Sequence, residues 1–180
     1  MKATSDLEND HVYILKLCDI MEKITHGERL ELSHIEDIVD LIRSYADGLH
    51  HKKEEDLLFP KMSEKGFPPE SGPIAVMLMD HEAGRSYVKG IAEGVNAYKS
   101  GDTGSKKEIF GNMLGYVELL RNHIAKENNI LFRMADNCLS DKEQQELLDK
   151  FGYAEKSHKE KGTTADYISR INKLASVYGL

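Results

Sequence analysis

The sequence predicts an all-α protein: an up-down-up-down antiparallel four-helix bundle followed by a short C-terminal helical appendage. Apolar residues recur at intervals of three and four over most of the 180 residues, which is the period of an amphipathic helix. The interruptions are short and contain Gly, Pro or Ser, and no stretch shows the alternation typical of a strand. Short loops between long helices make consecutive helices antiparallel.

The first two helices are bounded by capping residues and breaks. The first begins at Ser5 or Asp6, either of which can cap a helix, and ends near Gly27. The second begins at Ser33, where a glutamate three residues later completes the pattern of a capping box, and continues to about Lys61. A glycine and two prolines shortly afterwards predict the turn into the next helix.

The third and fourth helices form the second half of the predicted bundle. The third begins near Pro73, which is favourable in a first helical turn, and ends near Tyr98. A Ser-Gly-Asp segment terminates it. The fourth runs from about Ser105 to Asn137.

The last 40 residues predict the appendage. Ser140 and Glu143 form a second capping-box pattern, which starts a shorter fifth helix. A Gly-Thr-Thr segment then separates a final amphipathic stretch over 167–178. We therefore expect a bundle domain over residues 1–138 and a C-terminal extension over 139–180 that packs on the same domain.

Charge and composition exclude several classes of function. The net charge of −7 disfavours nucleic acid and anionic membranes, whose binding depends on clustered Lys and Arg. No stretch approaches the roughly 20 apolar residues of a spanning helix, and the N-terminus lacks the apolar run of a signal peptide. Cys18 and Cys138 form no disulfide framework, and we expect Cys18 to be a buried, inert thiol. A cytoplasmic location follows as the expectation.

One internal repeat carries chemistry. Residues 50–59 and 123–132 both fit the pattern H-x-x-K-E-x-x-[LI]-L-F. The His and Glu of each copy are four residues apart, so they project from one helical face. The imidazole can therefore bind one metal ion while the carboxylate reaches between two. The Leu and Phe that follow can close a dry wall over the site.

Two Asp-His pairs complete the candidate site. His11 lies about 19 residues before the middle of the first loop and His50 about 20 after it, and His81 and His123 each lie about 21 residues from the third loop. Antiparallel helices would bring these histidines to a similar height. The predicted metal ligands are His11, His50, Glu54, His81, His123 and Glu127.

This ligand set suits a pair of transition-metal ions, with iron first. A mononuclear zinc site would need only three or four ligands, usually at tighter spacing. Two bridging carboxylates would fix the distance between the metals and offset much of their charge. Two histidines per metal would leave positions open for water, an oxo bridge, O2 or NO.

These residues resemble the hemerythrin-like (HHE cation-binding) domain family. The resemblance spans about residues 5 to 137 and rests on His11, HHKKEEDLLFP at 50–60, DHEAGR at 80–85 and HIAKENNILF at 123–132. It implies a non-haem di-iron centre with an oxo or hydroxo bridge, in which Glu54 and Glu127 bridge and the four histidines are terminal ligands.

One position departs from the oxygen-carrying members of that family. They have a further histidine four residues after the ligand of the third helix, where this chain has Arg85. The departure resembles the family's bacterial branch, which is associated with NO response, iron handling and iron-sulfur repair.

Several neighbours of the predicted ligands have open roles. His51 is adjacent to His50 but about 100° around the helix, which favours an outer or surface role over ligation. Glu55 and Glu82 are expected to be solvated or to support the ligands. Tyr116 lies two turns before His123 and is either a core aromatic or part of the pocket lining. Arg85 either pairs with nearby carboxylates, Glu82 or Asp80, or guards the entrance.

Three functions fit this site. The first is binding or sensing of O2 or NO at a non-haem di-iron centre. The second is an enzyme that reduces NO or peroxide, or that handles iron as a ferroxidase or in iron-sulfur cluster repair. The third is a structural module stapled by metal, in which the C-terminal helices bind a partner or form a homodimer.

Overall fold

The computed structural model describes residues 1–27, 30–159 and 162–180. These residues form helices and connecting turns, and no strand occurs among them. The all-helical prediction is therefore confirmed. No helix in this described part is both long and apolar enough to cross a membrane.

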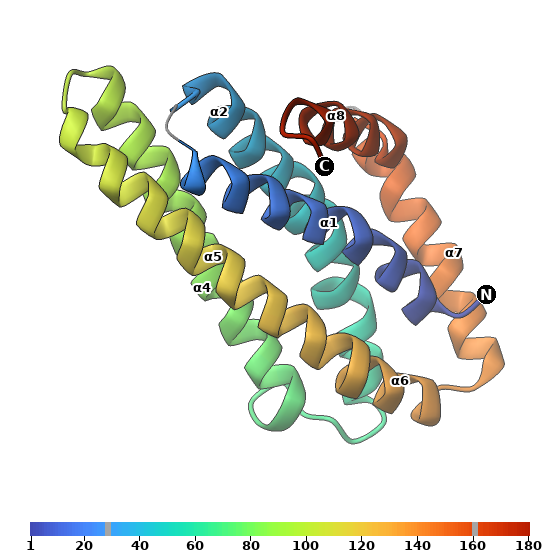
Figure 1. The fold of residues 1–180 in the computed structure, drawn as a ribbon. Helices are drawn as coiled ribbons and strands as arrows, with labels where there is room; N and C mark the ends of the chain where they lie inside the picture. Colours follow the sequence, from blue (N-terminus) through green and yellow to red (C-terminus); the bar gives the residue numbers. More distant parts are fainter. Residues whose placement is uncertain (28–29, 160–161) are drawn as a thin grey trace.

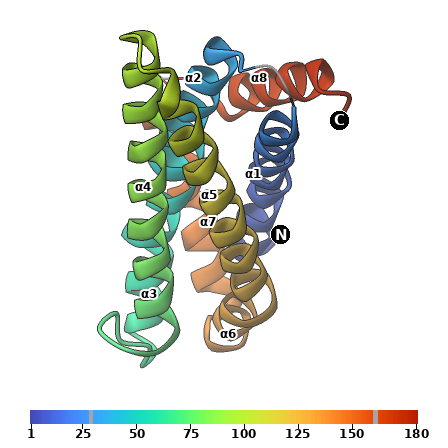
Figure 2. The same cartoon turned by 60° about the vertical axis from the view of Figure 1, so that its left-hand side comes forward.

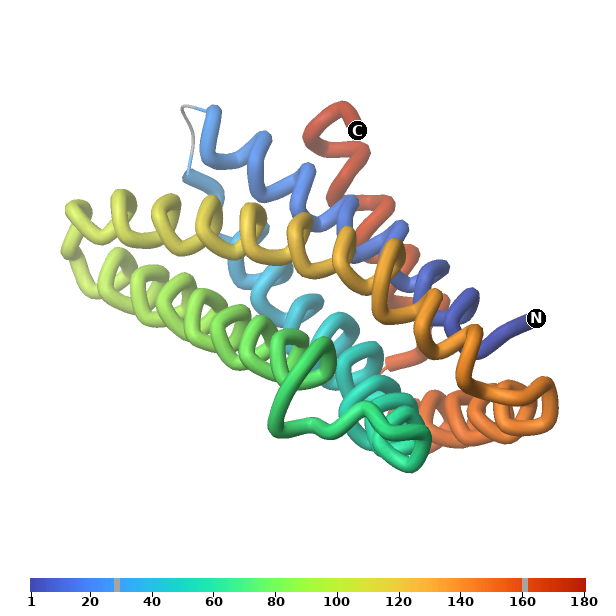
Figure 3. Tube along the Cα trace, turned by 90° about the horizontal axis from the view of Figure 1, so that it is seen from below, coloured from blue at the N-terminus to red at the C-terminus, as the bar shows by residue number. Residues whose placement is uncertain are grey.

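Four long helical segments make up the body of the protein (Figure 1). The second and fourth segments change hydrogen-bonding register along their length and are therefore described in parts. Their bounds are α1 Ala3–His26; α2 Leu32–Leu41, η1 Ile42–His51, η2 Glu54–Leu58 and α3 Phe59–Ser63; α4 Gly72–Lys99; and η3 Thr103–Ser105, α5 Lys106–Lys126, η4 Glu127–Leu131 and α6 Phe132–Cys138. Helices α4 and α5 lie side by side, as Figures 1 and 3 both show.

The second and fourth segments contain π-helical stretches, η1, η2 and η4, which interrupt otherwise α-helical structure. π-Helical turns are rare and frequently occur at functional sites. Here they coincide with both copies of the repeat, since η1 contains His50, η2 starts at Glu54 and η4 starts at Glu127. The change of hydrogen-bonding register therefore occurs at both copies of the repeat, and in the first copy it begins earlier, at Ile42.

The C-terminal helices α7 (Asp141–His158) and α8 (Thr164–Val177) pack on this body. Helix α7 lies against α1, η1 and η2, on the side away from α4 and α5 (Figure 1). Helix α8 runs across α1 and α2 near one end of the bundle (Figure 2). Among the described residues, the C-terminal helices thus cover one flank of the bundle and leave the flank formed by α4 and α5 without a cover.

The predicted helix starts were correct in part. Ser140 and Glu143 form the expected capping box at the start of α7. The expected caps at Ser5, Asp6 and Ser33 were wrong, because α1 begins earlier, after Lys2, and α2 begins after Glu31 with no side-chain cap. Packing of the apolar face, rather than capping, sets the start of these two helices.

Two apolar clusters occupy the bundle interior. One contains Ile14, Met21 and Ile109 and extends toward α8, and the other contains Leu7, Phe59 and Phe132 and extends toward α7. A layer of buried polar and charged side chains is present in the same interior. It consists chiefly of the histidines and glutamates of the predicted site.

Candidate metal centre

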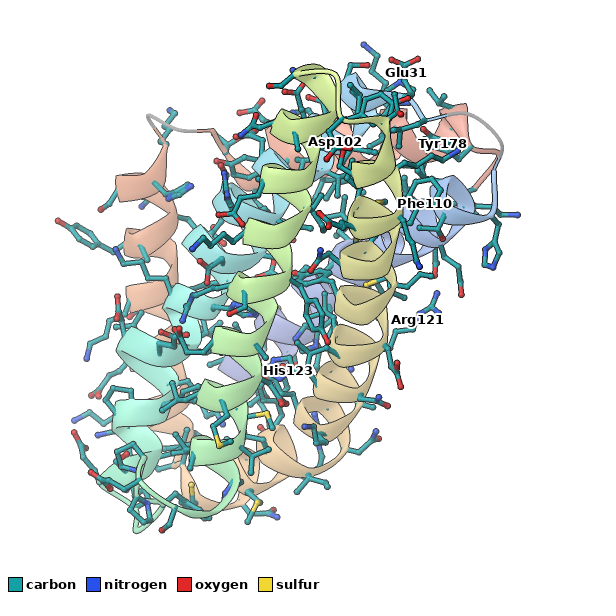
Figure 4. The ribbon with its side chains drawn as sticks, turned by 90° about the vertical axis from the view of Figure 1, so that its left-hand side faces the viewer. Glu31, Asp102, Phe110, Arg121, His123 and Tyr178 are labelled. Atoms are coloured by element: carbon teal, nitrogen blue, oxygen red, sulfur yellow. The ribbon has the colours of Figure 1, made fainter. Side chains whose placement is uncertain are left out.

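The structure brings all six predicted ligands together in two overlapping groups. In each group, one ligand atom from every member lies within 4.8 Å of the others. The first group is His11, His50, Glu54 and Glu127; the second is His51, Glu54, His81 and His123. All of these side chains are buried. Figure 4 shows His123 between α4 and α5, whereas Arg121 on the same helix lies on the outer side.

The histidines form two pairs whose Nε2 atoms converge. The Nε2 atoms of His11 and His50 lie 3.0 Å apart, and we call these two residues the covered pair. The Nε2 atoms of His81 and His123 lie 3.2 Å apart, and we call these two the open pair. Two ligands on adjacent octahedral positions, with bonds of about 2.1 Å, lie about 3 Å from each other. Both pairs therefore have the spacing of two ligands on one metal ion.

The two glutamates lie between the pairs. Glu54 places Oε1 3.6 Å from His50 Nε2 and Oε2 3.6 Å from His81 Nε2. Glu127 places Oε2 3.2 Å from His11 Nε2 and Oε1 3.2 Å from His123 Nε2. Each carboxylate thus presents one oxygen to each histidine pair, which is the arrangement of a carboxylate that bridges two metal ions.

The four glutamate oxygens have no hydrogen-bond donor among the described residues, although both side chains are fully buried. Buried polar atoms are almost always satisfied in folded proteins. Burial and repulsion from Glu127 raise the pKa of Glu54 well above its ordinary value. A cavity of converging lone pairs and carboxylates fits a pair of cations, which would neutralise the charge and complete the coordination.

Each histidine ring is fixed through its other nitrogen. The Nδ1 atoms donate to carboxylate or amide oxygens, which leaves each Nε2 lone pair free for a metal. The acceptors are Asn128 for His11 at 2.7 Å, Asp10 for His50 at 3.3 Å, Asp47 for His51 at 3.2 Å, Glu55 for His81 at 2.6 Å and Asp80 for His123 at 3.2 Å. Glu55, which was expected to be solvated or to support the ligands, thus supports His81.

The Asp-His dipeptides act across helices. Asp10 precedes His11 but accepts from His50, and Asp80 precedes His81 but accepts from His123. The lysine of each repeat copy then binds the same aspartate: Lys53 Nζ lies 2.7 Å from Asp10, and Lys126 pairs with Asp80. The repeat therefore encodes the ligands together with the groups that orient them.

The phenylalanine of each repeat copy also covers a histidine. Phe59 stacks on His81, with ring centroids 6.0 Å apart, and Phe132 stacks on His11 at 5.5 Å. The leucines before them, Leu58 and Leu131, are buried in the same apolar cluster. These contacts form the dry wall that the repeat predicted.

The charged groups behind the covered pair stabilise one another. Burial alone would raise the pKa of Asp10, but hydrogen bonds from His50 and Lys53 hold it below its ordinary value. Burial would lower the pKa of Lys53, but Asp10 and Asp6 raise it. Burial lowers the pKa of His50 to about 4, which keeps the imidazole neutral and able to bind metal.

The structure places His51 in the second group, against the expectation of an outer or surface role. Its ring is buried and stacks on His81, with centroids 3.8 Å apart. Burial and the neighbouring His81 lower its pKa to about 3, so this imidazole is neutral too. A difference between the two copies of the repeat could have pointed to His51. The first copy reads His50-His51, whereas the second reads His123-Ile124.

Arg85 stands where the oxygen carriers have a further histidine, and it binds carboxylates. Its guanidinium donates to Asp47 at 2.9 Å, to Glu55 at 2.8 Å and to Glu82 at 2.6 Å. The expected pairing with Glu82 is confirmed. Two of these partners, Asp47 and Glu55, also accept from His51 and His81, so Arg85 holds the acceptors of two candidate ligands.

A cavity of about 110 Å³, the side cavity, adjoins the open pair. Its lining includes Asp47, His51, His81, Gly84, Arg85, Tyr116 and His123. Neither His11 nor His50 contributes to it. Tyr116 is therefore a lining residue, and burial raises the pKa of its phenol well above the ordinary value, which keeps the hydroxyl protonated.

The chain belongs to the hemerythrin HHE cation-binding domain family, whose model matches residues 2–135. The fold and the His/Glu cluster agree with that membership. An uncharacterized protein of Mycobacterium tuberculosis is 19% identical to this chain, over 99% of the chain and 72% of the relative.

Two further relatives have descriptive names. A probable iron-sulfur cluster repair protein of Haemophilus influenzae is 33% identical, over 66% of this chain and 54% of the relative. The iron-sulfur cluster repair protein YtfE of Salmonella schwarzengrund is also 33% identical, over 48% of this chain and 40% of the relative. The match thus covers about half or less of these repair proteins. No solved structure matches the chain significantly.

Proposed function

We propose that this chain is a non-haem di-iron protein whose metal ligands are His11, His50, Glu54, His81, His123 and Glu127, with His51 as a seventh. The observation that carries the proposal is the placement of Glu54 and Glu127. Each buried carboxylate has one oxygen beside each histidine pair and has no hydrogen-bond donor among the described residues. An up-down-up-down order of the four long segments would supply the ligands from all four.

The function that this site supports best is reversible binding or sensing of a small ligand such as O2 or NO. Iron would supply the redox and ligand-binding chemistry when bound. The protein orients the ligands through the acceptors on Nδ1 and excludes water with Phe59 and Phe132. The side cavity leaves room for an added molecule next to the open pair.

A second candidate is an enzyme that reduces NO or peroxide, or that handles iron for cluster repair. Two observations favour it: the relatives named as iron-sulfur cluster repair proteins, and Arg85 in place of the further histidine of the oxygen carriers. The same seven residues would hold the iron in either function.

Metal analysis tests the site. We expect the wild type, purified without added metal, to contain two iron ions per chain. Glu127→Gln keeps the size of the side chain but removes the bridging charge, so it should contain fewer than two. Glu118→Gln, on the exposed face of the same segment, is the matched control. Full iron retention in Glu127→Gln would contradict the ligand assignment.

Oxygen exposure separates the two functions. The iron-loaded protein is reduced and mixed with one equivalent of O2 while the visible spectrum is recorded. A stable band that disappears when O2 is removed is expected for a binding protein. Rapid oxidation with turnover of the oxidant would instead establish the enzyme. No spectral response, together with a metal-dependent melting temperature, would leave a structural role for the metal.

We also propose that the extension over 139–180 forms one cooperative unit with the bundle over 1–138. Glu155 of α7 lies 3.3 Å from Lys53, and Tyr167 of α8 packs on Tyr45, with ring centroids 5.6 Å apart. Urea denaturation should therefore show one transition by circular dichroism. Two separated transitions would contradict the proposal.

A further inference from the structure

We propose that Arg85 is a positioning residue that makes one half of the centre, the open half, bind its iron more tightly than the other. The open half is the open pair together with His51, and the covered half is the covered pair. Arg85 acts through Asp47 and Glu55, the carboxylates behind two histidines of the open half. The inference rests on the proposed di-iron function and adds the order in which the two iron positions fill.

The two carboxylates share single oxygen atoms between Arg85 and the imidazoles. Asp47 Oδ1 accepts from His51 Nδ1 at 3.2 Å and lies 2.7 Å from Arg85 Nη2. Glu55 Oε1 accepts from His81 Nδ1 at 2.6 Å and lies 2.8 Å from the same Nη2. One guanidinium nitrogen therefore fixes the two oxygens that orient two candidate ligands.

Arg85 also keeps the two carboxylates apart from solvent and beside the histidines. It lies in α4, one turn after His81, whereas Asp47 lies in η1 and Glu55 in η2. Without the guanidinium, two like charges would remain close together and would repel each other. Both carboxylates are partly exposed, so they could turn toward water. The imidazoles would then lose the acceptors that hold their rings in place.

The covered half has a neutral group at the corresponding position of the repeat. Glu55 directly follows Glu54 in the first copy, and Asn128 directly follows Glu127 in the second. Asn128 Oδ1 accepts from His11 Nδ1 at 2.7 Å, so the two positions orient a histidine in the same way. Only Glu55 brings a negative charge, and a carboxylate acceptor raises the basicity of an imidazole ligand.

The open half therefore has the stronger set of ligands. Each of its three histidines donates to a carboxylate, from Asp47, Glu55 or Asp80. The covered half has two histidines, and only His50 donates to a carboxylate. A metal ion is held more tightly by more ligands and by more basic ones. The iron of the open half should therefore bind first and leave last.

Stepwise loading tests the order. Isotopically enriched iron(II) is added without oxygen to the metal-free protein, and each addition is followed by Mössbauer spectroscopy. Competition with a chelator gives the two dissociation constants. The wild type should bind one iron about tenfold more tightly than the other, and one quadrupole doublet should appear before the second.

An exchange of charge between the repeat copies tests the cause. Glu55→Gln should weaken the tighter iron about tenfold, and Asn128→Asp should tighten the weaker iron by about the same factor. The double variant should therefore bring the two dissociation constants close together or reverse their order. Glu82→Gln is the control, since Glu82 pairs with Arg85 and is 73% exposed. A merely structural role would not strengthen iron binding in Asn128→Asp.

Replacement of Arg85 tests the positioning role. In Arg85→Met the tighter iron should bind about tenfold more weakly and its Mössbauer doublet should change, while the doublet of the other iron stays. Arg85→Lys should restore part of the affinity, because an ammonium neutralises Asp47 and Glu55 but lacks the planar fork that binds both. Arg121→Met, which removes surface ion pairs of α5, is the matched control.

The outcomes separate this inference from the proposed function. Two irons of unequal affinity, with only the tighter one weakened in Arg85→Met and Glu55→Gln, support the inference. Equal affinities in the wild type, unchanged dissociation constants in the variants, or equal weakening of both irons would overturn it and leave the di-iron proposal intact. If Arg85→Met does not fold, Glu55→Gln and Asn128→Asp decide alone. A wild type that does not bind two irons would overturn the proposed function, and the inference with it.

Discussion

The two halves of the candidate metal centre are built from the same sequence pattern but differ in their surroundings. In both halves an Asp-His dipeptide on one helix meets an H-x-x-K-E segment on the next, with the aspartate held between the imidazole and the lysine. Lys53 of the covered half has a side chain 0% exposed, whereas its counterpart Lys126 is 38% exposed.

The difference comes from the C-terminal helices. Helix α7 brings Glu155 and Phe151 over Lys53, whose ammonium lies 5.5 Å from the centre of the Phe151 ring. Nothing comparable covers Lys126 in the described part of the chain, and the side cavity lies on the flank of α4 and α5. The two halves have the same local pattern, but one is sealed and the other is accessible, because α7 covers only one flank of the bundle.

The largest expected contrast is in stability. Lys53→Met removes a buried cation and leaves Asp10 with only neutral donors nearby, so the free energy of unfolding should fall by about 3–5 kcal/mol. Lys126→Met removes a partly exposed ion pair and should cost at most about 1 kcal/mol. Urea denaturation of the two variants and the wild type measures both values. Equal losses would refute the distinction between the halves.

An intermediate effect is expected on iron affinity. Asp10→Asn and Asp80→Asn remove the charged acceptors of His50 and His123, which should weaken iron binding by about 10- to 100-fold. The Asp10→Asn variant should bind iron more weakly than the Asp80→Asn variant, since it also deprives Lys53 of its nearest anion. Competition with a chelator gives the iron dissociation constants, and Asp19→Asn, on the exposed face of α1, is the control. Wild-type affinity in both variants would exclude a role for these aspartates.

The smallest effect is expected at Cys18. This side chain of α1 is fully buried in the apolar core of the bundle, and burial raises the pKa of its thiol to about 12. The candidate ligands of both halves are nitrogen and oxygen atoms, so Cys18→Ala should leave the iron content unchanged. A drop below two irons per chain would show that sulfur takes part after all.

The sequence predicted the helices and a candidate set of metal ligands, because both predictions depend on local spacing. Apolar residues at three- and four-residue intervals identified each long helix, and the four-residue separation of His50 from Glu54, and of His123 from Glu127, put each pair on one face. Counting from the loops then placed His11 and the other histidines at one height, and the structure brings all six side chains together.

Other features could not be predicted because they depend on partners distant in sequence. Ser33 matches a capping box but does not cap, since α2 already begins after Glu31. His51 was expected on an outer face, yet it lies in a π-helical stretch and its ring packs on His81. The aspartate of each Asp-His dipeptide accepts from a histidine about 40 positions away, which spacing along one helix does not reveal.

The sequence by itself determined the helical class, the membership of the hemerythrin HHE family and the chemical identity of a His/Glu centre, because periodicity and a repeated motif are properties of neighbouring residues. Only the tertiary structure decided which half of that centre is sealed and which adjoins a cavity. The packing of α7 over Lys53 and the meeting of Gly84 with Tyr116 join segments far apart along the chain. Such contacts exist only once the helices have packed.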